Sequence, residues 1–143
     1  MGSMLLEGIK VVEFGSVFAG PFITAYLADY GAQVIKVESH SHLDLIRQSA
    51  PFKDGITGVD RSGCFPIANN SKYGITLNLR HPRASDINKK LITWADIVVE
   101  NFGAGAMGRS GLGYDDLKKM NPGIIMLSAT IQGQPGPRSK FVG

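Results

Sequence analysis

Short apolar runs rich in β-branched residues recur along the chain, separated by stretches with helical or turn composition. Each run is bounded by glycine, proline or polar residues, which is typical of buried strands. Strands are predicted at residues 9–14, 33–38, 73–79, 96–102 and 123–130. Helical segments between several of them imply parallel strands joined by crossovers. The pattern predicts an α/β fold, a Rossmann-like three-layer domain around a mostly parallel sheet.

Three segments have helical character. Residues 21–29 begin with a proline, which suits a first helical position, and are followed by Gly31, a good C-terminal cap. Residues 81–95 form an amphipathic pattern, and residues 114–120 a shorter one that ends before a proline. The side chains expected on the buried side of the second helix are Ile87, Leu91, Ile92 and Ala95.

Two regions fit neither pattern. Residues 39–71 mix glycines, prolines and charges, which predicts an irregular excursion with one helical turn near residues 43–47. Residues 133–143 form a Gly/Pro-rich loop with no element after it, so we expect the chain to be a fragment of a longer protein. Residues 1–4 are expected to be a cloning scar, "MGS", followed by Met4 as the native start. Residues 5–143 are expected to form the α/β domain.

Composition narrows the function classes. The 143 residues are 43% hydrophobic and 19% charged, which suits one globular domain. The net charge of +3, without a dense basic cluster, argues against nucleic acid and suits a small anionic ligand. Cys64 is the single cysteine, so no internal disulfide forms and a cytoplasmic location is expected. The longest uncharged apolar run, 17–28, is too short to cross a membrane.

Gly103, Gly105 and Gly108 have the G-x-G-x-x-G spacing of dinucleotide-binding loops. That motif requires a helix to start inside it and an acidic residue to end the next strand. Here more glycines follow, and the next strand ends in Ser128 and Thr130 without a carboxylate. The sequence therefore argues against NAD or flavin and indicates a connection that lets a ligand approach the backbone closely.

Other candidate groups are open to more than one interpretation. His40 and His42 lack an evident third metal ligand, so a solvated loop is expected and no metal. Glu38 and Glu100 end predicted strands and are either loop anchors or catalytic groups. The acidic pair in "GYDDLKK", Asp115 and Asp116, is expected to cap a helix.

Arg80 and Arg109 follow two of the predicted strands. If the sheet is parallel, both can converge on one crevice at its carboxyl edge and bind phosphates through their forked donors. The alternative is that each is an ordinary surface arginine.

The segments "LEGIKVVEFGSVFAGPFITAYLADYGAQVIKVES", "NSKYGITLNLRHP", "WADIVVENFGAGAMGRSGLGYDDLKKMNPGIIMLSAT" and "QGQPGP" together resemble the N-terminal part of a class III CoA-transferase. This family includes formyl-CoA and carnitine CoA-transferases, with α-methylacyl-CoA racemase as a relative. The resemblance covers nearly all of residues 5–143. It implies an α/β large domain with a Rossmann-like core, a smaller second domain, and a homodimer of two interlocked chains.

The resemblance also implies a coenzyme A site in the "VFAGP", "LNLR" and "ENFG" segments and at the arginine that follows the last of them. The residues carried over are Val17, Phe18, Ala19, Ser39, Leu77, Asn78, Leu79, Arg80, Asn101, Phe102, Gly103 and Arg109. Ser39 departs from the family, because some members have a basic residue there that contacts the nucleotide. Arg47 and Lys72 are candidate substitutes for that contact.

In the family's transferases an aspartate attacks the acyl-CoA carbonyl, and an aspartyl-CoA thioester then hands CoA to a carboxylic acid. By the same resemblance this aspartate lies beyond the chain, so the fragment alone is expected to be inactive. The acid substrates are expected to be aryl-substituted or dicarboxylic acids. Two alternatives stay open: an acyl-CoA racemase or epimerase of the same family, and a nucleotide-binding module without catalysis.

Overall fold

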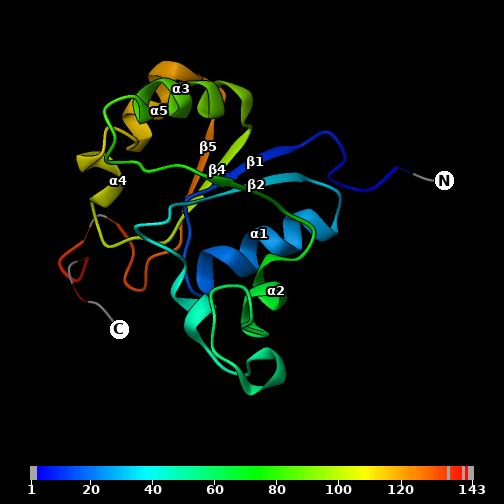
Figure 1. Cartoon of the computed structure of the whole chain (residues 1–143). Coiled ribbons are helices and arrows are strands. Elements are labelled where there is room, and N and C mark those ends of the chain that lie inside the picture. The colour runs from blue at the N-terminus through cyan, green and yellow to red at the C-terminus, as the bar shows by residue number, and fades with distance from the viewer. Residues whose placement is uncertain (1–2, 135, 140, 142–143) are drawn as a thin grey trace.

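The computed structural model describes residues 3–134, 136–139 and 141. At its centre is a five-stranded sheet in the order β3-β2-β1-β4-β5, with every neighbouring pair parallel. The strands are β1 (Lys10–Glu13), β2 (Gln33–Glu38), β3 (Tyr73–Thr76), β4 (Ile97–Glu100) and β5 (Ile125–Ser128). Helices lie on both faces of the sheet (Figure 1), so the α/β class and the three layers predicted from the sequence are confirmed.

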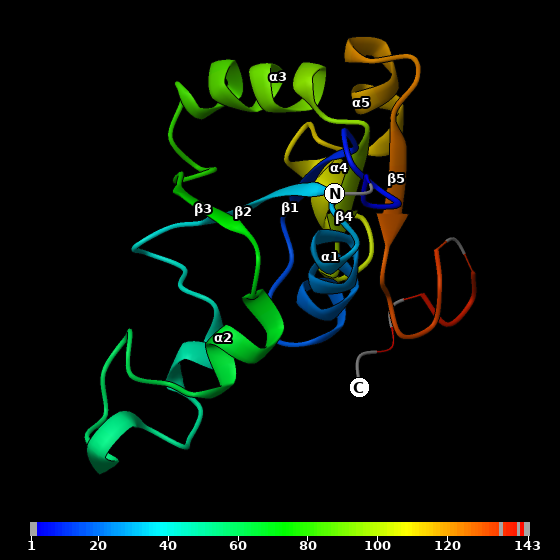
Figure 2. The same ribbon diagram turned by 90° about the vertical axis from the view of Figure 1, so that its right-hand side faces the viewer.

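Two groups of helices cover the sheet. On one side lie α1 (Ala19–Asp29) and α2 (Cys64–Asn69), and on the other α3 (Ala84–Trp94), α4 (Ala106–Arg109) and α5 (Tyr114–Met120), as Figures 1 and 2 show. Two short 3₁₀ turns, Leu45–Gln48 and Lys53–Gly55, belong to the excursion between β2 and β3. The described part of the chain contains no helix long and apolar enough to cross a membrane.

The three central strands β1, β2 and β4 each contribute to two separate cores, because successive side chains of a strand point to opposite faces, whereas β3 and β5 contribute to one. Val11 packs with Ala28 of α1, whereas its neighbour Val12 packs in the cluster that holds Ile92 of α3 and Leu117 of α5. Because both faces of the central strands are buried, their sequences are continuously apolar and do not alternate between apolar and polar residues.

The predicted elements agree with the structure in place, and β2 and α5 also agree in their bounds, whereas other elements differ at their ends. β3 stops at Thr76, three residues before the predicted end, and α1 begins at Ala19, two residues before Pro21. The helices α2 and α4 were not predicted; they have six and four residues and are too short to show a periodic pattern. Met1 and Gly2, assigned to a cloning scar, lie outside the described residues.

The buried face of α3 was predicted only in part. Ile92 and Ala95 are buried and Leu91 is half-buried, but Ile87 is 45% exposed. The helix instead turns Ala84, Asn88 and Ile92 inward, one stripe at i, i+4 and i+8. Ala84 and Ile92 pack in the same core cluster as Val12 of β1, so this stripe of the helix faces the sheet and Ile87 faces solvent.

Candidate functional site

The carboxyl ends of the five strands lie at one edge of the sheet, where open parallel sheets bind ligands. The loops that follow the strands form two pockets there. The first has a volume of about 680 Å³. The predicted site residues that line it are Val17, Ser39, Leu77, Asn78, Leu79, Arg80, Asn101, Phe102 and Gly103.

The second pocket has a volume of about 570 Å³. The predicted site residues that line it are Val17, Phe18, Ala19, Asn101, Phe102, Gly103 and Arg109. The two pockets adjoin, because Val17 and residues 101–103 line both. All twelve residues carried over from the family resemblance thus surround this pair of pockets. Arg80 lines the first pocket and Arg109 the second, so the two arginines lie at adjoining parts of this edge of the sheet.

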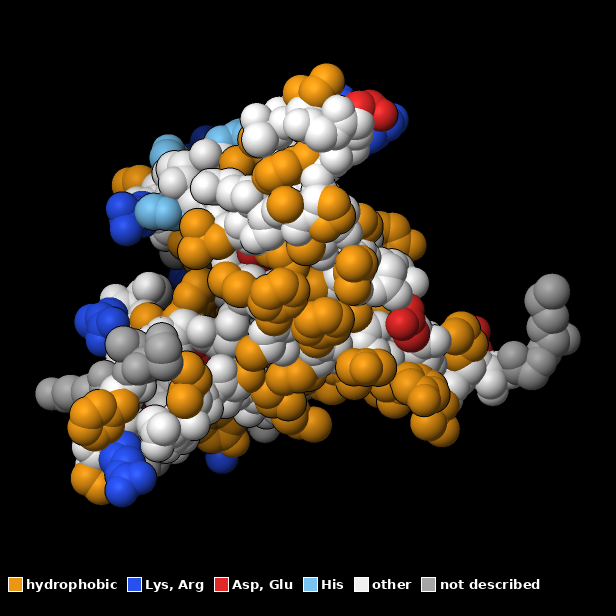
Figure 3. Space-filling view, turned by 90° about the horizontal axis from the view of Figure 1, so that it is seen from below, with side chains coloured by type: hydrophobic (Ala, Val, Ile, Leu, Met, Phe, Trp, Pro, Cys, Tyr) orange, Lys and Arg blue, Asp and Glu red, His pale blue; other side chains and the backbone are white. Residues whose placement is uncertain are grey.

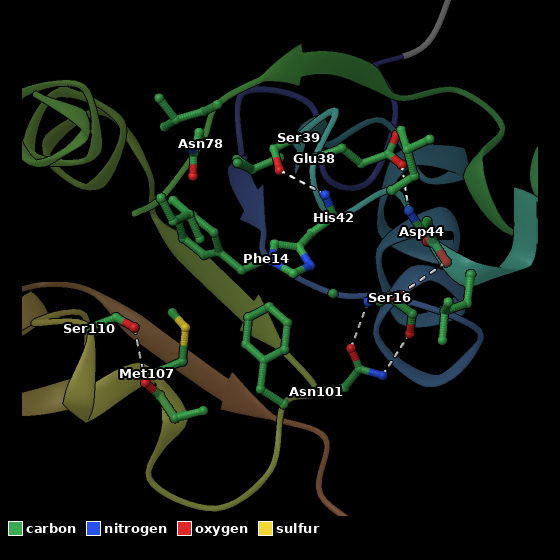
Figure 4. Close-up of a pocket in the computed structure, with 18 of the residues that line it drawn as sticks. Phe14, Ser16, Glu38, Ser39, His42, Asp44, Asn78, Asn101, Met107 and Ser110 are labelled. Carbon is green, nitrogen blue, oxygen red and sulfur yellow. Dashed lines mark hydrogen bonds between the residues drawn. The ribbon is translucent and has the colours of Figure 1, made fainter. Parts of the chain in front are cut away.

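The first pocket has an apolar interior and a polar rim. Phe14, Val37 and Met107 supply buried apolar walls, which suit a flat base or an alkyl chain. Figure 4 shows the imidazole of His42 projecting into this pocket. Among the described residues, His42 and Arg80 are the basic side chains that line it. This arrangement can hold an apolar group inside and an anionic group at the rim.

The loop between β1 and α1 forms the wall common to both pockets, and Asn101 fixes it. Asn101 Oδ1 accepts a hydrogen bond from the backbone N–H of Ser16 at 2.8 Å, and Asn101 Nδ2 donates to the carbonyl oxygen of Ser16 at 2.8 Å (Figure 4). A Cβ added at Gly15 or Gly20 would lie 3.2 or 3.0 Å from Asn101 Oδ1. Glycine at these two positions therefore allows the close approach of loop and amide.

A buried group of charges lies under the same loop. Glu13 accepts hydrogen bonds from Lys36 Nζ, Lys72 Nζ and Thr24 Oγ1 at 2.8, 2.8 and 2.6 Å. Lys36 Nζ also lies 2.9 Å from Asp44 Oδ2. Burial lowers the pKa of the Lys72 ammonium, and Glu13 opposes this shift. These contacts tie β1, β2, the loop after β2 and the chain after α2 together.

Glu38 and Glu100 act as loop anchors. Glu38 accepts hydrogen bonds from Arg47 at 2.7 and 3.0 Å and from the backbone N–H of Asp44 at 2.9 Å. Burial works to raise the pKa of the Glu38 carboxyl, but these hydrogen bonds outweigh it and hold that pKa below its usual value. Glu100 Oε2 accepts from the backbone N–H of Phe102 at 2.8 Å.

The two candidate substitutes for the basic residue at position 39 are engaged elsewhere. The guanidinium of Arg47 is paired with Glu38 and Asp60 and stacks on the Phe65 ring at 3.5 Å. Lys72 is buried against Glu13. Neither lines either of the two pockets.

The glycine segment forms a short helix that the sequence did not reveal. α4 begins inside the motif, after Gly105, whose φ of 73° is left-handed. It ends after four residues, and Ser128 closes β5 without a carboxylate, so the requirements of a dinucleotide loop are still not met. Asp115 and Asp116 were expected to cap α5, but Gly113 is the capping residue and both acids lie in the first turn.

Among the described residues, no group of three or more His, Cys, Asp or Glu side chains is placed to hold a metal ion. His40 and His42 follow β2, and His42 is tied to Ser39 by its backbone N–H, which donates to the hydroxyl oxygen at 3.1 Å.

Sequence reasoning missed three functional features: the orientation of His42, the role of Asp44, and the buried pairing of Glu13 with two lysines. The helical turn was predicted near residues 43–47, but the 3₁₀ turn covers Leu45–Gln48, so Asp44 is its N-cap and accepts from the backbone N–H of Ile46. Aspartate is a typical N-cap residue, which was the available signal in the sequence. No local pattern could have paired Glu13 with Lys72, because 59 residues separate them.

Comparison with known proteins identifies the family of the chain. Residues 6–143 match the model of CoA-transferase family III. The chain is 41% identical over 136 residues to an acyl-CoA transferase of Fusarium pseudograminearum, covering 92% of this chain and 30% of that protein. It is 40% identical over 139 residues to the succinyl-CoA:glutarate CoA-transferase of Mus musculus, covering 96% and 31%.

A solved structure is similar throughout. The crystal structure of a CAIB/BAIF family protein from Brucella suis superposes with a TM-score of 0.88 at 35% identity, covering 99% of this chain and 37% of that one. The chain thus spans about a third of the length of the relatives it matches. On its sequence and its fold, this chain belongs to CoA-transferase family III.

Proposed function

We propose that this chain is the CoA-binding part of an enzyme that transfers CoA between an acyl-CoA and a carboxylic acid. The observation that carries the proposal is the pair of adjoining pockets around which all twelve implied residues gather. CoA is elongated, with a flat base, phosphates and a long pantetheine arm. Two connected pockets with apolar walls, and with Arg80 at one and Arg109 at the other, offer complementary groups to such a ligand.

The proposed reaction proceeds through a carboxylate nucleophile. The carboxylate attacks the thioester carbonyl, the C–S bond breaks, and the CoA thiolate leaves behind a mixed anhydride. The thiolate attacks the enzyme carbonyl of that anhydride, which gives an enzyme–CoA thioester and frees the donor acid. The acceptor acid then repeats both steps in reverse order and leaves as its own acyl-CoA.

We propose that this nucleophile is an aspartate of the parent protein outside residues 1–143, and that the chain alone does not turn over. The carboxylates that line the first pocket support this, because both are already engaged: Glu38 by Arg47, and Asp44 by Lys36 and two backbone N–H groups. A carboxylate held in this way is a weak nucleophile. The role of this chain is then to bind and orient CoA.

The acceptor is proposed to be a dicarboxylic acid, and the parent a cytoplasmic homodimer. The names of several relatives, which act on glutarate, malate or citramalate, support the acceptor class. Apolar side chains gather on the face that Figure 3 shows, over α1, where Tyr26 is 65% and Tyr30 56% exposed. An apolar surface of this kind is typical of a face that another protein surface covers.

Titration calorimetry of the chain with CoA and with NAD tests the proposal. We expect CoA to bind and NAD to bind weakly or not at all, and a preference for NAD would contradict a CoA site. For the parent protein, transfer of CoA from succinyl-CoA to free glutarate supports transfer chemistry. Exchange of the α-proton of an acyl-CoA in D₂O without CoA transfer supports the racemase alternative instead.

A further inference from the structure

The four buried charges beneath the loop after β1 stand out as a costly way to hold a fold. Glu13, Lys36, Lys72 and Asp44 have side chains that are at most 3% exposed. Taking charges out of water costs free energy that their mutual attraction only partly offsets, and apolar residues often stabilise a core better. The two carboxylates and the two ammonium groups have a net formal charge of zero. Their contribution to this region is therefore the fixed geometry of the segments that they connect.

Asp44 connects this charge group to the pockets. Its Oδ2 lies 2.9 Å from Lys36 Nζ, so the carboxylate has one preferred orientation. Its Oδ1 then accepts hydrogen bonds from the backbone N–H of Val17 at 2.7 Å and from Ser16 Oγ at 3.1 Å. The ionised carboxylate makes these bonds stronger than neutral ones.

Val17 needs such support because its backbone is strained. Its φ of 66° lies in the left-handed region, which a β-branched residue rarely adopts because the conformation is strained. Val17 is also a residue that both pockets share. A relaxed Val17 would therefore move the common wall of the site.

We propose that Asp44 is a positioning residue: it holds Val17 in the left-handed conformation and so fixes the wall shared by the two pockets, with Lys36 and Glu13 orienting its carboxylate. Lys72 completes the charge balance on the other oxygen of Glu13. Asp44 lines the first pocket, but both oxygens of its carboxylate already have partners, so it acts on the ligand through the loop. For CoA as that ligand, this inference rests on the proposed function.

The first test compares affinities for CoA by titration calorimetry of the 143-residue chain. Asp44→Ala removes both hydrogen bonds to the loop and is expected to weaken CoA binding about tenfold or more. Asp44→Asn keeps the shape and an acceptor oxygen and should lose less, which also provides a variant if Asp44→Ala folds poorly.

Asn121→Ala is the matched control. Asn121 Nδ2 donates to the carbonyl oxygens of Ile92 and Ala95 at 3.2 and 2.8 Å, and it lies outside both pockets. All proteins are compared at a temperature at which circular dichroism shows them folded. The control should keep the affinity within about twofold. A loss in the control as large as in Asp44→Ala would overturn the proposal, since general destabilisation would then explain both.

A double-mutant cycle with Val17→Gly isolates the backbone effect. Glycine adopts positive φ freely, so the loop should need Asp44 less. We expect Asp44→Ala to cost clearly less CoA affinity in the Val17→Gly background than in the wild type. An equal loss in both backgrounds would refute the positioning of Val17.

Hydrogen exchange separates this inference from the proposed function. The Val17 amide should exchange faster in Asp44→Ala than in the wild type or in Asn121→Ala, whatever the ligand is. Faster exchange in a chain that prefers NAD would contradict the CoA site and still support the role of Asp44. Unchanged protection of Val17 would overturn that role even in a chain that binds CoA.

Discussion

Asn101 binds both backbone polar groups of Ser16, which is 85 residues away in the chain. One amide side chain accepts from the N–H and donates to the carbonyl oxygen, as a neighbouring strand would. The end of β4 thereby fixes the loop after β1, and both segments line the two pockets.

Asn101→Ala should therefore weaken CoA binding and lower the free energy of unfolding. The substitution leaves two half-buried backbone groups without their partners, which costs about 1–3 kcal/mol. Titration calorimetry and denaturant unfolding measure the two effects. Asn70→Ala, which removes a hydrogen bond to Asp29 outside both pockets, is the control. A CoA affinity that does not change in Asn101→Ala would argue against a ligand at this wall.

Arg80→Ala and Arg109→Ala should each weaken CoA binding, because each removes a forked cationic donor from one pocket. We expect about a tenfold loss for each, and free-energy losses that add in the double variant because the pockets are distinct. Arg83→Ala, an exposed arginine outside both pockets, should bind CoA as the wild type does. The idea fails if Arg83→Ala loses as much affinity as the other two.

His42→Ala should weaken binding of a phosphorylated nucleotide, since this imidazole and Arg80 are the basic side chains at the first pocket. Comparing CoA with 3′-dephospho-CoA tells which phosphate is involved. If the 3′-phosphate lies there, the loss appears with CoA and disappears with 3′-dephospho-CoA. His40→Ala is the control, because His40 belongs to the same loop but does not line either pocket. Equal affinities in all three proteins would exclude a role for His42 in binding.

Glu38 should make the fold sensitive to acid. Its pKa in the folded chain lies below the ordinary value of 4.5, so its stabilising contribution is complete above that pH and is lost as the pH falls through the folded pKa. Glu38→Gln should therefore show a smaller drop in the free energy of unfolding between pH 7 and acid than the wild type does. Urea unfolding at several pH values measures this.

Glu7→Gln serves as the control for acid unfolding, because Glu7 is exposed. It should follow the wild-type pH dependence. If Glu38→Gln also follows it, then the ion pair of Glu38 with Arg47 contributes nothing to acid sensitivity.

Sequence patterns predicted the sheet well because a doubly covered parallel strand needs only an apolar run between turn residues. Residues 33–38 were predicted as a strand with the bounds that β2 has. The face of α3 was harder to predict. The structure turns Ala84, Asn88 and Ile92 inward, and Ile87 was misplaced because a small and a polar residue do not stand out as core positions in the sequence. Helices of one or two turns, such as α4, are too short for their apolar residues to show a helical periodicity.

By itself, the sequence determined the α/β class, the order of the elements and the segments that line the two pockets, because apolar periodicity, turn residues and the family pattern are local properties. Only the tertiary structure decided that Arg80 and Arg109 line different pockets and that Arg47 and Lys72 are engaged elsewhere. The tertiary structure also brings Asp44 and Asn101 together, because both accept hydrogen bonds from Ser16. Contacts between residues tens of positions apart follow from how parallel strands align, which no single segment encodes.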